Sequence, residues 1–215
     1  MGFDSTSDKM VVVLVVDMQE NMWDGEGGIS DRLLQKRMQA MDSLADDIGK
    51  FTNDMRDNGA QIVWALMDND ELSNYGDLHH LQRQDGDLEI RKTAQSALPE
   101  NTAFFEELKA QAEQDGKDLE IKVCGVWALE CIANTAVTLH EAGYDMRVVG
   151  DLILDSAKPC MDDDRPDFAE AHALHAIGGA TGLGTEVSQW SEDVVAGQKA
   201  IASAHSKNVP DGFEL

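Results

Sequence analysis

Basic side chains are scarce in this chain of 215 residues, which has 17 Lys and Arg against 41 Asp and Glu and a formal net charge of −24. So few basic groups cannot build the positive surface that nucleic acids and anionic lipids require, and the field of the whole molecule repels both. The acidic residues are dispersed along the chain and form no acidic tail. We therefore expect neither nucleic acid nor a membrane as a partner.

Two interpretations of this acidity stay open. A dispersed excess of Asp and Glu over Lys is expected of a protein that stays soluble in concentrated salt, where self-repulsion is screened. It is equally compatible with an ordinary acidic cytosolic protein. A melting temperature that does not rise with NaCl concentration would exclude the first interpretation.

Proline, cysteine and long apolar runs are also scarce. The chain has 4 Pro, no Pro/Gly/Ser-rich linker and no internal repeat, so we expect one domain over residues 1–215 with terminal tails at 1–9 and about 205–215. The apolar run Val11–Val16 is too short for a membrane span or a signal-peptide core. The odd set of three cysteines, Cys124, Cys131 and Cys160, argues against a disulfide framework. A soluble, cytoplasmic protein with reduced thiols is expected.

Apolar runs of strand length alternate with segments of helical period. The runs lie at 10–16, 61–67, 119–126 and 145–154, a short extended run ends at Arg91 and Lys92, and the helical segments lie at 31–57, 101–115, 129–142, 165–177 and 185–204. Strictly alternating strands and helices predict an α/β fold, a three-layer α/β/α sandwich around a mainly parallel, Rossmann-like sheet. In such a sheet the site lies at the carboxyl ends of the strands.

Three residues at predicted strand ends could carry chemistry there. Asp17 directly follows the first apolar run and is a candidate general base, although a role as a turn cap is the simpler interpretation. Cys131 falls in the first turn of a helix after a strand, where the helix dipole favours a thiolate, although many buried cysteines serve only as small apolar residues. Lys92 would supply a positive charge to both if it turned inward, whereas most lysines are solvated.

Together these residues resemble the isochorismatase-like cysteine hydrolases, which include nicotinamidase, N-carbamoylsarcosine amidase and isochorismatase. The resemblance covers most of the chain, and its three elements occur in order. They are a strand ending in D-x-Q (Asp17, Met18, Gln19), a K-x-x-x-S-A-[FL] segment (Lys92, Ser96, Ala97, Leu98) and a G-V-x-x-x-x-C-[VI]-x-x-T-A signature (Gly125, Val126, Cys131, Ile132, Thr135, Ala136).

The resemblance implies a catalytic triad of Asp17, Lys92 and Cys131. It also implies a cis peptide bond between Val126 and Trp127, which would direct the backbone N–H groups of Trp127 and Cys131 at the substrate oxygen. The expected activity is cysteine-dependent hydrolysis of a C–N bond in a small amide, carbamoyl or ureido substrate, through a thioester. No cofactor is expected, and the resemblance implies a homo-oligomer, either a dimer or a tetramer.

The chain departs from the family pattern at its metal motif. Nicotinamidases carry D-x-H after the second strand, followed by another His, whereas this chain has Asp68, Asn69 and Asp70, with His79 and His80 further on. Asp68, Asp70, His79 and His80 could still form an oxygen and imidazole site for Zn²⁺ or Mn²⁺. An acidic solvated loop without metal is the favoured interpretation.

Aromatic residues near the expected site suggest a pocket wall. Trp127 and Trp23 could line it and suit a flat amide or ring, although Trp23 could instead cover the core edge, and Trp64 is expected in the core.

Two other functions stay open, an isochorismatase-type vinyl-ether hydrolase and a catalytically silent binding or assembly module. The first is disfavoured because isochorismatases usually have a small residue in place of Cys131, and the second because all three triad residues are present.

Overall fold

A computed structural model describes residues 8–22, 31–68 and 75–154 of the chain. This part contains five strands, three α-helices and two short helical turns. The elements are β1 (Lys9–Val16), α1 (Asp31–Asp57), β2 (Gln61–Met67), β3 (Leu88–Lys92), the 3₁₀ turn η1 (Pro99–Asn101), α2 (Thr102–Gln114), β4 (Asp118–Val126), the π-helical turn η2 (Ala128–Ile132), α3 (Ala133–Glu141) and β5 (Asp145–Leu154). In the described part of the chain, helices separate the strands except between β2 and β3. No helix in the described ranges is long and apolar enough to cross a membrane.

The strands form one parallel sheet in the order β3-β2-β1-β4-β5. β1 lies at its centre and pairs with β2 on one side and β4 on the other. Val12 of β1 lies opposite Gln61 of β2, and Lys9 of β1 lies opposite Asp118 of β4. A central parallel strand is covered on both faces, which explains the near-continuous apolar sequence of β1. Its residues from Val12 to Val16 are all fully buried.

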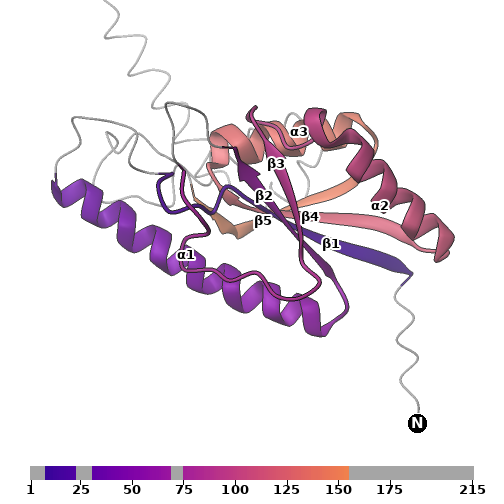
Figure 1. Cartoon of the computed structure of the whole chain (residues 1–215), viewed down its shortest axis with the longest axis horizontal. Helices are drawn as coiled ribbons and strands as arrows, with labels where there is room; N and C mark the ends of the chain where they lie inside the picture. The colour runs from indigo at the N-terminus through magenta and orange to yellow at the C-terminus, as the bar shows by residue number, and fades with distance from the viewer. Residues whose placement is uncertain (1–7, 23–30, 69–74, 155–215) are drawn as a thin grey trace, which may run out of the picture.

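Helices cover both faces of the sheet, as Figure 1 shows. Because side chains alternate along a strand, Val13 and Val15 of β1 pack with α1, and Leu14 packs in the cluster formed with α2 and α3. α1 contributes Met41, Leu44, Ala45 and Ile48 to its cluster, whereas α2 and α3 contribute Phe105, Leu108, Ala136 and Leu139 to the other. The result is the three-layer α/β fold that the alternation of elements predicts.

The sequence predictions are confirmed for most described elements, and two details differ. The short extended run that ends at Lys92 is a full edge strand, β3, paired in parallel with β2. The helix predicted from residue 129 begins instead as a π-helical turn at Ala128 and becomes α-helical at Ala133. The helices predicted at 165–177 and 185–204 lie outside the described residues.

Candidate active site

Asp17, Lys92 and Cys131 meet at the carboxyl edge of the sheet. Asp17 directly follows β1, Lys92 is the last residue of β3, and Cys131 lies in η2, which follows β4. Parallel strands bring these three ends to one edge, although the residues are far apart in the sequence. β2 lies between β1 and β3, so only a long side chain from β3 can reach Asp17.

The Lys92 ammonium joins the other two side chains. Its Nζ lies 2.7 Å from Asp17 Oδ2 and 3.4 Å from Cys131 Sγ. It also donates to the carbonyl oxygen of Ala94 at 3.2 Å and lies 4.0 Å from the sulfur of Met67, at the end of β2. These contacts hold a positive charge between a carboxyl group and a thiol.

Burial sets the protonation of this site. Asp17 and Lys92 are 0% exposed and Cys131 is 3% exposed. Burial raises the pKa of Asp17, and this effect exceeds the lowering by the charge of Lys92. Burial and the negative charge of Asp17 raise the pKa of Cys131 to about 12, against the lowering by Lys92. Burial therefore favours the protonated thiol of Cys131 and opposes the thiolate that the helix dipole alone would favour.

Gly125 allows β4 to approach the end of β1. Its φ is +115°, and a Cβ atom built there would lie 2.1 Å from the carbonyl oxygen of Val16. Only glycine tolerates this conformation together with this contact. The next residue begins the Val126–Trp127 peptide bond, which is cis, so this prediction is confirmed. Gly125 thus places the chain leading to Cys131 directly beside the residue that precedes Asp17.

The side chain of Gln19 fixes the turn that carries Asp17. Gln19 Oε1 accepts a hydrogen bond from Met67 N at 2.8 Å, and its Nε2 donates to the carbonyl oxygens of Met67 and Gly76, both at 3.2 Å. Asp17 itself has a left-handed backbone, with φ 53°, a conformation that costs about 1 kcal/mol or more for a residue other than glycine. The glutamine of the D-x-Q motif therefore has a positioning role that the sequence interpretation did not assign.

Hydroxyl groups join the segment after Lys92 to the helix after Cys131. Ser96 Oγ lies 2.7 Å from Thr138 Oγ1, and Ala97 N donates to Thr135 Oγ1 at 3.1 Å. Ser96 and Thr135 are the hydroxyl-bearing residues of the second and third family motifs and are both buried. Buried hydroxyl groups need partners, and here they hold two parts of the site together.

The tryptophans and the other cysteines have separate positions. Trp64 is fully buried, which confirms its core assignment, and its indole N–H donates to Asp87 at 2.9 Å. Trp127 is 7% exposed and packs in the apolar cluster beneath α1, a packing role that the sequence interpretation did not include. Cys124 is a buried core residue. Trp23 and Cys160 lie outside the described residues.

The candidate metal residues do not gather as the D-x-H motif implies. The described part of the chain holds one group of metal-ligating side chains, which consists of Asp42, His79 and His80 and does not include Asp68. Asp70 lies outside the described residues. Asp42 is a residue of α1 that the sequence analysis missed, because no local spacing links it to the two histidines. The family's metal motif thus does not fit the described residues, and no step of the chemistry is routed through a metal.

The family model of the isochorismatase domain matches residues 11–164, more than half of the chain. This range includes all three residues of the candidate site. No curated protein sequence matches the chain.

Solved structures share the fold. An isochorismatase-like hydrolase from Alkaliphilus metalliredigens aligns with a TM-score of 0.58 at 13% identity, over 82% of this chain and 92% of its own. The pyrazinamidase of Pyrococcus horikoshii, solved in complex with zinc, aligns with a TM-score of 0.56 at 16% identity, over 80% and 96%. A nicotinamidase from Bacillus subtilis aligns with a TM-score of 0.54 at 14% identity, over 80% and 96%. At these identities the likeness shows the fold alone.

Proposed function

The chain belongs to the isochorismatase family of hydrolases, and on this premise we propose that it is a cysteine-dependent hydrolase of a C–N bond in a small amide, carbamoyl or ureido compound. The observation that carries the proposal is the buried contact of Lys92 Nζ with both Asp17 Oδ2, at 2.7 Å, and Cys131 Sγ, at 3.4 Å. A nucleophile, a base and a charge that stabilises both are the parts that covalent hydrolysis requires.

The first half of the reaction acylates the cysteine. Asp17 accepts the thiol proton of Cys131 while the sulfur attacks the carbonyl carbon of the substrate and forms the C–S bond. The backbone N–H groups of Trp127 and Cys131 stabilise the developing oxyanion. Protonated Asp17 then donates its proton to the nitrogen as the C–N bond breaks, so that an amine or ammonia leaves and a thioester remains.

The second half restores the enzyme. Asp17, ionised again, removes a proton from water, whose oxygen attacks the thioester carbonyl. The C–S bond breaks, the acid product leaves, and the proton on Asp17 returns to the sulfur of Cys131. One carboxyl group can serve both halves because burial raises its pKa, which brings it closer to the range of a useful acid and base.

Lys92 lowers the cost of each charged state in this sequence. Its ammonium contacts the carboxylate before proton transfer and the thiolate after it, so the negative charge moves between two partners of one cation. The three groups share protons and titrate as a unit. We therefore assign Lys92 an electrostatic role and no proton transfer of its own.

The position of Cys131 favours C–N hydrolysis over the alternative functions. A vinyl-ether hydrolase of the isochorismatase type has no need of a thiol 3.4 Å from a buried ammonium. A silent binding module would have no reason to keep an ion pair at 0% exposure, because buried charge pairs are weak contributors to stability.

A panel of small amides and ureides, assayed for ammonia release, tests the proposal with the full chain. A substrate that is turned over should leave an acyl mass on Cys131 after rapid acid quenching, and Cys131→Ala should lower kcat by at least about a thousandfold with no acyl mass. Cys124→Ala, a change in the core, is the matched control and should keep acylation on Cys131. Turnover retained in Cys131→Ala would refute the nucleophile, and turnover of an isochorismate-type ether with no C–N substrate would support the alternative.

A further inference from the structure

We infer that Asp42, His79 and His80 form a binding site for a divalent transition-metal ion, with Zn²⁺ as the best match. The site lies between α1 and the segment after residue 75, and it shares no side chain with the Asp17, Lys92 and Cys131 site. Its ligands are one carboxylate oxygen and two imidazole nitrogens. The proposal is independent of the proposed function.

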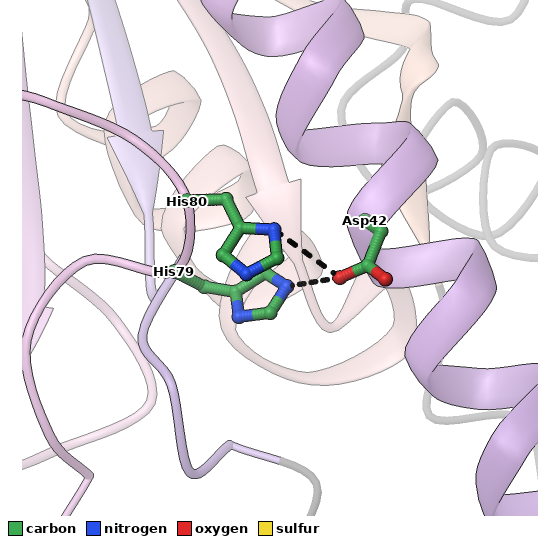
Figure 2. A group of neighbouring side chains, drawn as sticks. All are labelled: Asp42, His79 and His80. Atoms are coloured by element: carbon green, nitrogen blue, oxygen red, sulfur yellow. Dashed lines mark hydrogen bonds and ion pairs between the residues drawn. The ribbon is translucent and has the colours of Figure 1, made fainter.

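The three ligand atoms already converge, as Figure 2 shows. Asp42 Oδ1 lies 2.8 Å from His79 Nε2 and 3.4 Å from His80 Nδ1, and the three atoms all lie within 4.8 Å of one another. Ligands of a tetrahedral Zn²⁺ ion at its usual bond lengths are about 3.3 Å apart. An ion could therefore take the place of the proton between His79 and Asp42, and the two stacked rings would rotate so that both nitrogen lone pairs point at it.

The backbone prearranges the two histidines. Successive side chains of an extended segment point in opposite directions, but His80 has a left-handed backbone, with φ 51°. Its ring stacks on that of His79, with centroids 4.2 Å apart and an interplanar angle of 13°. Both rings thus present a nitrogen to the same oxygen of Asp42. Two adjacent residues can in this way supply two ligands to one ion.

Packing on both sides holds the ligands in place. His79 N donates to the carbonyl oxygen of Met18 at 2.9 Å, and the His79 side chain is buried. Asp42 lies on α1 between Met41, which is fully buried, and Leu44, which is also in the core. Both backbones are therefore anchored without the metal, which lowers the entropy that binding must overcome.

The donor set selects the class of metal. Two imidazoles and one carboxylate suit Zn²⁺ and other late divalent ions, whereas Mg²⁺ and Ca²⁺ prefer sites of oxygen ligands alone. His80 has a side chain that is 63% exposed and Asp42 one that is 47% exposed, so an ion can enter from solvent and keep water in its fourth position. Bound there, the ion would join α1 to the segment of His79 and His80, whose backbone is hydrogen-bonded to Met18, one residue beyond Asp17.

Equilibrium dialysis of the full chain against Zn²⁺, with Mg²⁺ in excess to occupy surface carboxylates, tests the site. The wild type should bind one Zn²⁺ per chain. Loss of even an indirect supporting contact costs about 10–100-fold in metal affinity, so His80→Ala and Asp42→Asn should each weaken binding at least tenfold. Both changes are at partly exposed side chains, so the variants should fold.

Two matched controls and one spectrum complete the test. His140→Ala, at an exposed histidine of α3, and Asp46→Asn, one turn along α1, should bind as the wild type does. Zn²⁺ should also raise the melting temperature of the wild type but not of His80→Ala. Failure of the wild type to bind, or equal binding by His80→Ala and Asp42→Asn, would overturn the site. A thiolate charge-transfer band in the Co²⁺-loaded protein would do the same, because it would place the metal on a cysteine.

Discussion

Two pairs of lysine and carboxylate lie at opposite edges of the same sheet, and their N–O distances are equal. Lys92 and Asp17 are 2.7 Å apart at the carboxyl edge, and Lys9 and Glu120 are 2.7 Å apart at the amino edge. The first pair is 0% exposed, whereas the side chain of Lys9 is 37% exposed and that of Glu120 is 9% exposed. The N–O distance is thus the same in the two pairs, whereas the exposure of their side chains to solvent differs.

The pKa values of the carboxyl groups in these two pairs are shifted in opposite directions. Burial raises the pKa of Asp17 despite its cation. Burial also raises the pKa of Glu120, but hydrogen bonds from Lys9 and Lys122, together with their charges, outweigh this and lower it to about 2. An ion pair whose cation is solvated and whose acid has several basic partners stabilises the charged form of that acid, whereas full burial of both partners makes every charge costly. Burial of both partners therefore separates the Asp17–Lys92 pair from the Lys9–Glu120 pair at the opposite edge.

Removing each lysine should give the largest contrast. Lys92→Met leaves a buried carboxyl group without its cation and should lower the free energy of unfolding by about 3–5 kcal/mol and abolish turnover. Lys9→Met, its control at the exposed edge, should cost less than about 1 kcal/mol. Urea denaturation at neutral pH measures both. Equal losses in the two variants would show that burial does not make the Asp17–Lys92 pair more sensitive than the Lys9–Glu120 pair. Combining Asp17→Asn with Lys92→Met should recover part of the lost free energy of unfolding, because the buried carboxylate is then removed as well.

Adding one methyl group at each edge of the sheet should give the second-largest difference in stability. Gly125→Ala, at the carboxyl edge, forces a Cβ against the backbone of Val16 and should cost about 2–5 kcal/mol. Gly143→Ala, before β5 at the amino edge, also has a positive φ, of 81°, but its Cβ would meet no atom within 4 Å. Gly143→Ala should lower the free energy of unfolding by about 1–2 kcal/mol, the cost of a left-handed backbone at a residue other than glycine. Thermal unfolding followed by circular dichroism compares them, and a smaller loss for Gly125→Ala would contradict the close approach.

Removing the charge of Asp17 should make the Cys131 thiol more reactive while it stops turnover. The negative charge of Asp17 raises the pKa of Cys131, so Asp17→Asn should lower that pKa and increase the thiolate fraction about tenfold for each unit. Iodoacetamide labelling of the full chain between about pH 6 and 9, read as the mass of the Cys131 peptide, measures this. Slower labelling in Asp17→Asn would mean that Asp17 already holds the thiol proton at rest.

The smallest effect should be a dependence of stability on acid pH at the amino edge. The folded-state pKa of Glu120, about 2, lies below the unfolded value of 4.5, so its stabilisation is present above 4.5 and lost as the pH falls toward 2. Glu120→Gln should remove on the order of 1 kcal/mol near neutral pH and little near pH 2, because the pair is partly solvated. Glu113→Gln, on the exposed face of α2, should leave the profile unchanged. Urea midpoints across this pH range provide the measurement.

Local pattern was enough to predict most of the fold. The alternation of apolar runs with helical segments correctly predicted β1, β2, β4 and β5, because a strand buried on both faces must be apolar along its length. The strand β3 was predicted only as an extended run, because its sequence, LEIRK, is mixed and among the described strands it pairs with β2 alone. The π-helical turn at Ala128 had no sequence signal, since its shape depends on how β4 joins α3.

The sequence by itself predicted that Asp17 and Cys131 follow apolar strands and that Lys92 ends an extended run, and thus that the three residues share one edge of a parallel sheet. Only the tertiary structure decided that Lys92 reaches across β2 to touch both partners at full burial, that Gly125 contacts Val16, and that Asp42 meets His79 and His80. The physical reason is that strand position follows from short-range hydrophobic pattern. Side-chain contacts between distant elements, and the burial that sets their pKa values, depend instead on how the layers pack.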